Sequence, residues 1–426
     1  MPRSVLLHAV GGCLVAVTAA FGAGDVRAAA PEPSAVIKTY ADIAQAAYED
    51  SLIAAKRLRD AVDALVASPS AEAMQAARAA WIAARPPYQQ TEVFRFGNPI
   101  VDDWEGKVNA WPLDEGLIDY VDGGYGTESD GNPFYTANII AHPKFQAGGT
   151  DYEAGRIDAR LLESLHEAGG VEANVAIGYH AVEFLLWGQD LNGTAAGAGE
   201  RPWTDYAKGD ACTHGNCERR GQYLAVASEM LVDELDWMTK QWTKGGAART
   251  ALQGDEGISA IVTGLGSLAY GELAGERMKL GLLLNDPEEE HDCFSDNTHN
   301  SHFYDVVGMR NVYLGSYMRI DGTKVEGPGL SALVAAKDPA LDAEMRAKLA
   351  ASYEAFSALK RRAETVEAYD QMIGAGNAEG NAVVEKGIAA LTDQTRSLER
   401  VVAALDLQLV SFEGSDSLDN PANVFK

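Results

Sequence analysis

The sequence predicts an all-α fold built from two helical-bundle domains with long loops rich in Gly and Pro. Long stretches carry apolar residues at helical spacing, and the alternating runs of β-branched residues that mark strands are nearly absent. The chain has 426 residues, too many for one ordinary core, and its apolar fraction of 46% is normal for a globular protein. Paired antiparallel helical bundles are therefore the expected architecture.

The first domain is expected over residues 34–245. Its first helix is amphipathic; Ser68-Pro69-Ser70 ends it and caps a second helix, which Pro86-Pro87 ends in turn. Residues 97–155 break the pattern with Gly, Pro, Asn, Asp and aromatic residues, and irregular segments of this kind often build a site. The expected helices span residues 34–66, 71–84, 174–187 and 218–242, and 88–96 resembles a resumption of the second.

The second domain is expected over residues 246–412, after a boundary at Lys244-Gly245-Gly246. Helix pairs rich in Ala near both ends of the chain, at 35–84 and 341–412, suggest that the two domains are related by duplication. A polar tail over 413–426 is expected to fray. The expected helices of this domain span residues 258–284, 304–317, 330–336, 341–373 and 379–412.

The N-terminus is typical of a secretory signal peptide over residues 1–29. Arg3 supplies the positive charge, an apolar stretch follows, and small residues offer cleavage after Ala28 or Ala29. No later apolar stretch is long enough to cross a bilayer, so the mature chain should be soluble and exported without a transmembrane span. Cys13 follows Val-Gly-Gly, which leaves a lipoprotein as the weaker alternative.

The chain is strongly acidic. Its formal charge is −27, from 62 acidic and 35 basic residues. Such a field repels nucleic acid and anionic lipid and attracts cations, so no nucleic-acid partner is expected. Solubility or adaptation to salt explains the same composition without any metal.

Two of the cysteines are expected to form a disulfide. Cys212 and Cys217 flank a short polar loop, and exported proteins meet an oxidising environment. A zinc site that includes the intervening His214 is the alternative, although it lacks a second pair of ligands. Cys293 is left over as a buried free thiol.

The most informative segment is an apolar, helix-like run from Gly178 to Gly188 that contains His180 and Glu183. Positions three apart lie on one face of a helix, so the two side chains can bind one metal ion. Gly178 would allow another backbone or a ligand to approach closely. The alternative is a buried salt bridge or a core histidine that is satisfied by hydrogen bonds.

Three further clusters supply candidate residues. Glu92 is a further candidate metal ligand, and Arg95 would orient a carboxylate or an anion, unless the two simply pair. Asp114 lies in an aromatic loop that could close over the site, or it caps a short helix. His299 and Asp296 belong to an acidic, histidine-rich loop over 288–302, the best source of ligands from the second domain; a capped surface loop is the alternative.

Several well-known motifs are absent from the sequence. It contains no P-loop, no Rossmann glycine pattern in a strand context and no haem-attachment motif. It also lacks the His-Glu-x-x-His motif of zinc proteases and a Gly-x-Ser-x-Gly nucleophile elbow.

These segments together resemble the imelysin-like family, specifically its iron-regulated exported members. The run Gly178-Tyr179-His180-Ala181-Val182-Glu183 fits the family's Gly-x-His-x-x-Glu motif. The resemblance covers nearly all of the mature chain. Four further segments carry it: Arg95-Phe96-Gly97, Trp111-Pro112-Leu113-Asp114-Glu115, Cys212 to Cys217, and Cys293-Phe294-Ser295-Asp296-Asn297-Thr298-His299.

The resemblance implies two four-helix-bundle-like domains that are related by duplication, with a functional site where they meet. It also implies a role in bacterial iron uptake. His180 and Glu183 become the leading metal ligands, with iron as the expected ion and zinc as the alternative. The expected location is the periplasm or the outer surface of a bacterium. The expected partners are a metal ion or small metal chelate, and a membrane protein of iron uptake.

The family is also classed as metallopeptidase-like. A hydrolytic zinc site needs an open position, usually three protein ligands, and a base that activates water, whereas only two ligands are visible at local spacing. We therefore expect a metal-binding protein rather than an enzyme. The alternatives are a zinc peptidase that uses the same pair, and a docking module for an iron-uptake partner in which the pair is only structural.

Overall fold

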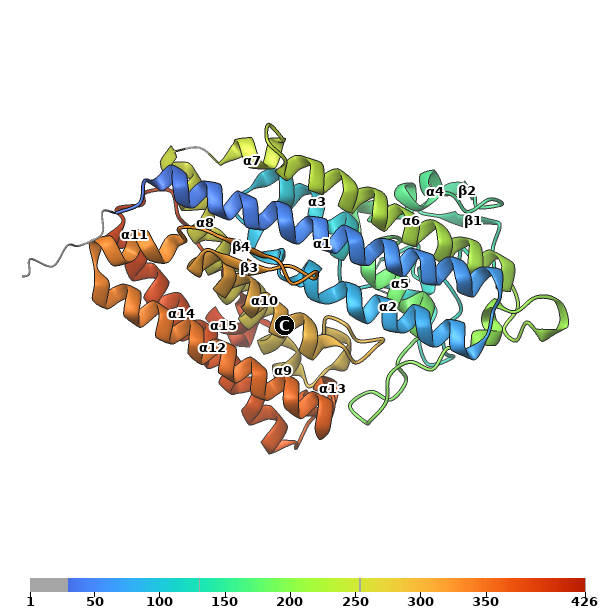
Figure 1. Ribbon diagram of the computed structural model, residues 1–426. Helices are drawn as coiled ribbons and strands as arrows, with labels where there is room; N and C mark the ends of the chain where they lie inside the picture. Colours follow the sequence, from blue (N-terminus) through green and yellow to red (C-terminus); the bar gives the residue numbers. More distant parts are fainter. Residues whose placement is uncertain (1–29, 130, 253, 426) are drawn as a thin grey trace, which may run out of the picture.

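The computed structural model describes residues 30–129, 131–252 and 254–425, and these are predominantly helical (Figure 1). The prediction of an all-α fold is confirmed. The predicted signal peptide, including Cys13, lies outside the described residues. No described helix is both long enough and apolar enough to cross a bilayer.

The first half of the chain forms a bundle around two long helices, α1 (Pro33–Ala67) and α6 (Cys217–Trp242), with α2 (Ala71–Gln89) packed against α1. Two shorter helices, α3 (Pro99–Asn109) and α5 (Gly178–Trp187), pack against α6. Further elements of this half are α4 (Ala159–Leu165), α7 (Ala247–Ala251) and 3-10 turns at Glu92–Phe94, Glu115–Leu117, Ala168–Gly170, Trp203–Tyr206 and Gly209–Ala211.

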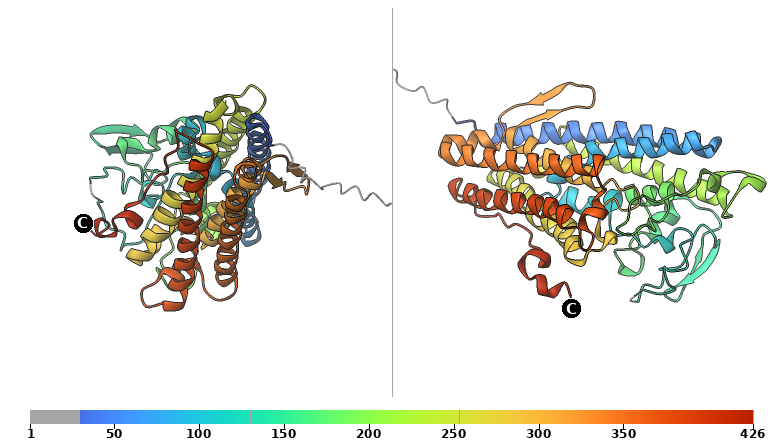
Figure 2. Two further views of the ribbon diagram at one scale, coloured as in Figure 1. Left: turned by 90° about the vertical axis from the view of Figure 1, so that its left-hand side faces the viewer. Right: turned by 90° about the horizontal axis from the view of Figure 1, so that it is seen from below.

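The second half forms another bundle. Its long helices α12 (Pro339–Thr365) and α14 (Ala378–Ala404) run side by side (Figure 2). Helix α10 (Thr298–Leu314) packs against both α12 and α2, so it joins the two bundles. The other elements are α8 (Gly254–Ser267), α9 (Leu280–Leu284), α11 (Leu330–Lys337), α13 (Tyr369–Ile373), α15 (Asp416–Asp419) and 3-10 turns at Pro287–Glu289 and Pro421–Asn423.

Helix α2 does not end at Pro86-Pro87, as the sequence suggested, but continues to Gln89. Each proline removes a backbone donor and strains the preceding turn, at about 3 kcal/mol or more in a helix interior. Buried side chains on both sides of the prolines, Arg85 and Tyr88 among them, hold the helix together. The prediction of a helix end here was wrong because tertiary burial outweighs the local preference.

Two small antiparallel hairpins escaped the sequence analysis. One pairs β1 (Lys144–Ala147) with β2 (Thr150–Glu153), and the other pairs β3 (Ser316–Met318) with β4 (Lys324–Glu326). Strands of three or four residues are too short for a periodic pattern to mark them. They lie outside the bundles and leave the fold class unchanged.

The helical run from 254 to 284 includes a π-helical stretch, Leu268–Lys279, on which the polar tail packs. A Cβ at Gly275 would lie 2.3 Å from Ser415 Cβ, so only glycine allows this close approach. The Ser417 hydroxyl donates to the Gly275 carbonyl at 2.9 Å, and Tyr270 donates to Asp419 at 2.7 Å. The prediction that the tail frays was therefore wrong for this segment.

Three predicted boundaries in the second half also move. Helix α10 begins at Thr298, earlier than predicted, which shortens the polar loop before it. The predicted helix over 341–373 is interrupted after Thr365, and the last helix ends at Ala404 rather than Phe412. The predicted domain boundary at 244–246 falls between α6 and α7, and it remains a prediction.

The cysteines behave as the sequence predicted. Cys212 and Cys217 form a disulfide with an S–S distance of 2.04 Å. Cys293 is free and buried. His214 does not join the cysteines in a zinc site: its Nδ1 lies against a carboxylate oxygen of Asp205 at 2.5 Å.

Candidate metal centre

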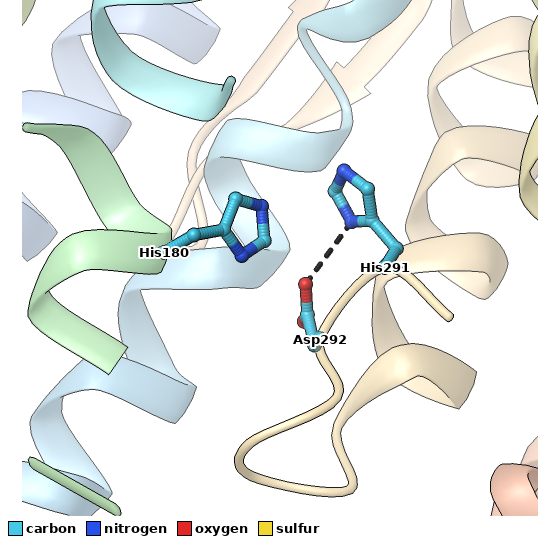
Figure 3. A group of neighbouring side chains, drawn as sticks. All are labelled: His180, His291 and Asp292. Carbon is cyan, nitrogen blue, oxygen red and sulfur yellow. Dashed lines mark hydrogen bonds and ion pairs between the residues drawn. The ribbon is translucent and has the colours of Figure 1, made fainter. Parts of the chain in front are cut away.

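Three segments far apart in the sequence meet in one buried polar cluster between the bundles. Helix α2 contributes Arg85, α5 contributes His180 and Glu183, and the loop before α10 contributes His291 and Asp292. Figure 3 shows the imidazole from α5 facing the loop that carries the second imidazole and the carboxylate. We refer to these five residues as the central cluster.

Gly178 determines where α5 begins. Its φ of +87° is in the region that favours glycine, and a Cβ there would lie 2.7 Å from the carbonyl oxygen of Val108. The first turn of α5 therefore packs directly against the end of α3. Trp81 fixes the same turn from α2, because its indole N–H donates to the carbonyl of Tyr179 at 2.9 Å.

His180 and Glu183 contact each other directly. The Nδ1 of His180 lies 3.0 Å from Oε2 of Glu183, and the side chains are 1% and 0% exposed. The other oxygen, Oε1, accepts from the backbone N–H of Ser295 at 3.1 Å and from its hydroxyl at 2.6 Å. The raised pKa of Glu183 favours its protonated form in the ion-free protein, which would donate to Nδ1. A bound cation would favour an ionised Glu183, which places the imidazole proton on Nδ1. The lone pair is then on Nε2, which is buried and has no hydrogen-bond partner among the described residues.

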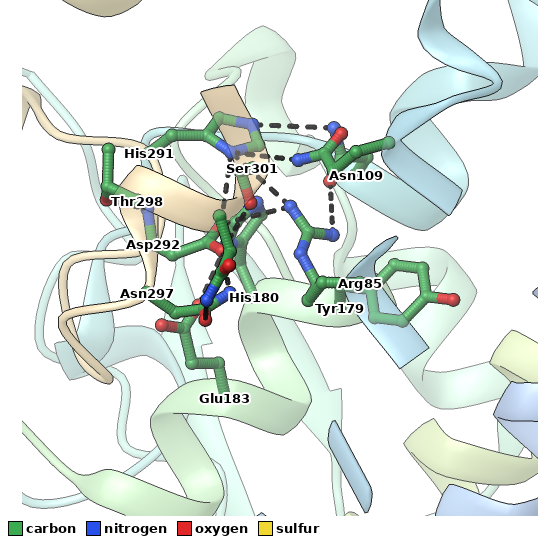
Figure 4. Close-up of polar contacts among 12 residues, drawn as sticks. Arg85, Asn109, Tyr179, His180, Glu183, His291, Asp292, Asn297, Thr298 and Ser301 are labelled. Carbon is green, nitrogen blue, oxygen red and sulfur yellow. Dashed lines mark hydrogen bonds and ion pairs between the residues drawn. The ribbon is translucent and has the colours of Figure 1, made fainter. Parts of the chain in front are cut away.

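His291 and Asp292 form a second contact within the cluster. The Nδ1 of His291 lies 3.0 Å from Oδ1 of Asp292, and the same oxygen accepts from Arg85 at 3.0 Å (Figure 4). Oδ2 of Asp292 accepts from the Asn297 amide at 2.9 Å and from the Ser301 hydroxyl. The carboxylate is thus held by partners from α2, its own loop and α10.

Arg85 is the buried cation of the cluster. Its guanidinium is 0% exposed, donates to Oδ1 of Asn109 at 2.8 Å, and stacks 4.8 Å from the ring centre of Tyr179. A guanidinium bonded to a carboxylate and stacked on an aromatic ring loses little on leaving water, because both contacts replace hydration. Arg85 therefore fixes the loop from α10 onto the first bundle.

The pKa values within the cluster follow from burial and neighbouring charge. Burial, and then the Arg85 charge, lower the pKa of His180 to about 3, and burial holds the pKa of His291 well below its usual range. Burial, and then Asp292, raise the pKa of Glu183. The pKa of Asp292 lies well below its ordinary value because Arg85 and His291 outweigh burial. Both imidazoles are therefore neutral near pH 7, the form that binds metals.

Three of these side chains have the chemistry of a metal site. One ligand atom from each of His180, His291 and Asp292 lies within 4.8 Å of the others. Ligand atoms about 2.0–2.2 Å from one ion in tetrahedral geometry lie about 3.3–3.6 Å apart, so a pair near the 4.8 Å limit would have to approach by about an ångström. Two imidazoles and a carboxylate with an unpartnered Nε2 fit a first-row transition metal.

The predicted residues Glu92 and Arg95 belong to a different buried network. Glu92 accepts from Arg277 at 2.7 Å, and Arg95 approaches Glu105 at 3.5 Å and Glu272 at 3.6 Å. The alternative prediction, a direct pair between Glu92 and Arg95, is not found among the described residues either. No hydrogen bond or ion pair joins either residue to the central cluster within the described chain.

Asp114, His299 and Asp296 also lie apart from His180. Asp114 accepts from the Asn132 amide at 2.7 Å within its own loop. His299 lies in the first turn of α10, with Nε2 at 3.1 Å from the Asn300 amide. Asp296 groups with two other carboxylates, and none of the three contacts His180 in the part of the chain that the structure describes.

The sequence analysis did not select Arg85, His291 or Asp292. Arg85 precedes two prolines, which predict a helix end. No local pattern indicates that Arg85 belongs to a site. His291 and Asp292 lie in the loop over 288–302, which is predicted to supply ligands from the second domain. The predicted ligand in that loop is His299. The adjacent His-Asp pair was the available signal, because a carboxylate often partners a functional imidazole.

Comparisons with known proteins bear on the family and the fold of this chain. The sequence profile of imelysin, designated Peptidase_M75, matches residues 44–398. The iron-regulated protein A of Synechococcus elongatus is 37% identical over 60 residues, which are 14% of this chain and 17% of that protein. The matched stretch is thus well under two thirds of that relative's length.

Two solved structures share the fold. One is a putative iron-regulated protein A precursor from Parabacteroides distasonis, with a TM-score of 0.61 and 17% identity over 88% of this chain and 96% of the other. The second is an imelysin-like protein from Psychrobacter arcticum, with a TM-score of 0.56 and 15% identity over 90% of this chain and 99% of the other. At these identities the structures establish the fold alone. Since the profile covers most of the chain, the protein belongs to the imelysin family.

Proposed function

We propose that this protein is an exported metal-binding protein that handles iron in bacterial iron uptake or homeostasis. The ion would bind where the two bundles meet, to His180, His291 and Asp292. Glu183 would orient His180 by accepting its Nδ1 proton, and a direct bond from Glu183 to the ion is the alternative. A carboxylate–histidine–metal arrangement of this kind fixes the tautomer and makes the ligand more basic.

The observation that carries the proposal is the unpartnered Nε2 of His180. A buried polar atom without a partner costs about 1–3 kcal/mol. Other described residues also carry such atoms, including both nitrogens of His302, so Nε2 of His180 supports the proposal because it lies in the central cluster. Here the orphan nitrogen lies beside a second imidazole, with ring centres 4.7 Å apart. The alternative, a purely structural His–Glu pair, predicts that altering the pair leaves metal affinity unchanged.

The ligand set and the comparisons favour iron. Two histidines and one carboxylate with positions left open are the set used by non-haem ferrous sites. A relative and a structural neighbour are both called iron-regulated protein A, a name that speaks of regulation by iron. The net charge of −27 would concentrate cations near the molecule. Zinc suits the same ligands and is the competing ion.

The setting that we propose is the periplasm or outer surface, where a free ion or small chelate would be taken up and passed to a membrane partner. The disulfide between Cys212 and Cys217 supports an oxidising compartment. The predicted signal peptide also supports export to such a compartment.

Burial favours binding over peptide hydrolysis at this site. A metallopeptidase must bring a polypeptide to its metal and keep a position open for water. His180 and Glu183 are only 1% and 0% exposed, so a peptide bond has no direct approach to them. Hydrolysis would need a large opening between the bundles, whereas a small ion needs only a narrow one.

Replacing Glu183 by glutamine tests the role of the pair. The amide keeps the shape but supplies a donor, so it opposes either the Ser295 donors or the Nδ1 proton of His180. If His180 changes tautomer, Nε2 carries the proton and loses its lone pair. We expect the affinity for ferrous iron, measured anaerobically by calorimetry on chelator-stripped protein, to fall about 10–100-fold.

The control is Glu364→Gln, which makes the same change on an exposed ion pair with Lys360 and should leave the affinity unchanged. Unchanged iron affinity in the Glu183 variant would instead support a docking module whose His–Glu pair is structural.

A further inference from the structure

Three carboxylates form a second cluster, and a fourth, Glu290, lines a small cavity with one of them. Asp190 follows the end of α5, Asp296 lies in the loop before α10, and Asp370 is in the first turn of α13. One oxygen from each of the three lies within 4.8 Å of the others. Three separate segments thus direct negative charge at one point.

Glu290 adds an independent sign that this point lacks a ligand. It is 1% exposed, and neither of its oxygens has a hydrogen-bond partner among the described residues. Its side chain lines the same small cavity as Asp190.

Asp370 is a second buried carboxylate that lacks hydrogen-bond partners among the described residues. It is 0% exposed, and neither oxygen has a hydrogen-bond partner within 30–129, 131–252 or 254–425. Burial and then Asp296 raise its pKa to about 7, and burial and then Asp190 raise the pKa of Asp296 to about 6. No Lys or Arg is among the main influences on any of these pKa values. Buried carboxylates left in this state are costly unless a proton or a cation neutralises them.

We propose that Asp190, Asp296, Asp370 and Glu290 form a second cation site, which takes a hard divalent ion of the Ca²⁺ class. The site offers only carboxylate oxygens, which suit Ca²⁺, Mg²⁺ or Mn²⁺ and not a soft metal. Ca²⁺ is favoured among them because it tolerates irregular geometry and two-oxygen binding, whereas Mg²⁺ demands an octahedron and retains water.

Access and space are consistent with an ion. Asp190 and Asp296 are partly exposed, so the cluster is open to solvent on one side. A cavity of about 10 Å³, room for about one water-sized sphere, is lined by Asp190 and Glu290 but not by Asp296 or Asp370, so it adjoins the cluster. An ion there would tie the end of α5 to α13 and to the loop that carries His291 and Asp292. This proposal does not rest on the iron site.

Calorimetry with Ca²⁺ on the chelator-stripped mature chain tests the proposal near neutral pH. We expect one binding event and a Ca²⁺-dependent rise in the thermal midpoint. Asp370→Asn should weaken Ca²⁺ binding by ~10-fold or more. Asp296→Asn should do the same, and it suits the local backbone because Asn tolerates the φ of +55° found there.

Three controls make the result decisive. Asp103→Asn removes an exposed charge that has no bonded partner and should leave Ca²⁺ binding unchanged. Asp370→Asn should fold and raise the midpoint of the ion-free protein, since it removes an unpaired buried carboxylate. His180→Ala should bind Ca²⁺ as wild type does. The proposal is overturned if wild type binds none of Ca²⁺, Mg²⁺ and Mn²⁺ at millimolar concentration, if both Asn variants bind Ca²⁺ normally, or if His180→Ala abolishes binding.

Discussion

Replacement of Arg85 by alanine is expected to lower the free energy of unfolding by about 3–5 kcal/mol. The change removes the buried guanidinium that neutralises Asp292 and leaves that carboxylate in the interior without its cation. It also removes the stacking on Tyr179 and the bond to Asn109. Urea unfolding followed by far-UV circular dichroism measures the difference.

Arg78→Ala is the matched control on the same helix. Arg78 donates to the backbone carbonyls of Leu186 and Arg201 but has no carboxylate partner, so its loss leaves no buried charge unpaired. We expect Arg78→Ala to lower the free energy of unfolding clearly less than Arg85→Ala does. Equal losses for the two variants would contradict a special role for the Arg85–Asp292 pair.

The pH dependence of Arg85→Ala has a definite sign. In the wild type the folded pKa of Asp292 is depressed, so the pair stabilises the protein above the unfolded pKa of about 3.9, and that stability is lost as pH falls through the folded pKa. Without Arg85, burial raises the folded-state pKa of Asp292. The folded state of the variant then tolerates a protonated Asp292 but is destabilised by an ionised one. The stability deficit of the variant should therefore grow between about pH 4 and pH 7.

Replacement of His180 by alanine is expected to weaken iron binding by about 100-fold or more, which corresponds to ~3 kcal/mol. The variant loses the free Nε2, the atom on which the proposed site depends. Calorimetry on the stripped protein under anaerobic conditions measures the affinity. Circular dichroism should show that the variant retains its helices, since the change is confined to one side chain of α5.

His299→Ala is the informative comparison. His299 was predicted as a ligand, yet its one hydrogen bond from a neighbouring side chain comes from Asn300, and no contact joins it to the central cluster among the described residues. We expect its loss to leave iron affinity unchanged. If His299→Ala weakens binding and His180→Ala does not, the ligands lie nearer the start of α10 than we propose.

The sequence was sufficient to predict what depends on periodicity and local spacing. The 3.6-residue repeat predicted α1, α6 and α14, because a helix that buries one face must carry such a repeat. The separation of His180 and Glu183 predicted that they would share a face, and they contact each other at 3.0 Å. The Cys212–Cys217 disulfide followed from a short loop and the predicted export of the chain.

The remaining features depend on contacts between distant segments. Nothing near Arg85 indicates that its partner, Asp292, lies 207 positions away. The same holds for Glu92, which pairs with Arg277 rather than with its neighbour Arg95. The helix through Pro86-Pro87 survives for the same reason, since long-range burial decides it. A single sequence contains local preferences and not the packing that overrides them.

The most direct test of the central claim is anomalous diffraction from crystals soaked anaerobically in ferrous iron, recorded on both sides of the iron absorption edge. We predict one anomalous peak at about 2.0–2.2 Å from Nε2 of His180, with His291 and Asp292 as further ligands. A peak that lies elsewhere, or none within bonding distance of His180 in fully soaked crystals, would contradict the proposed metal centre.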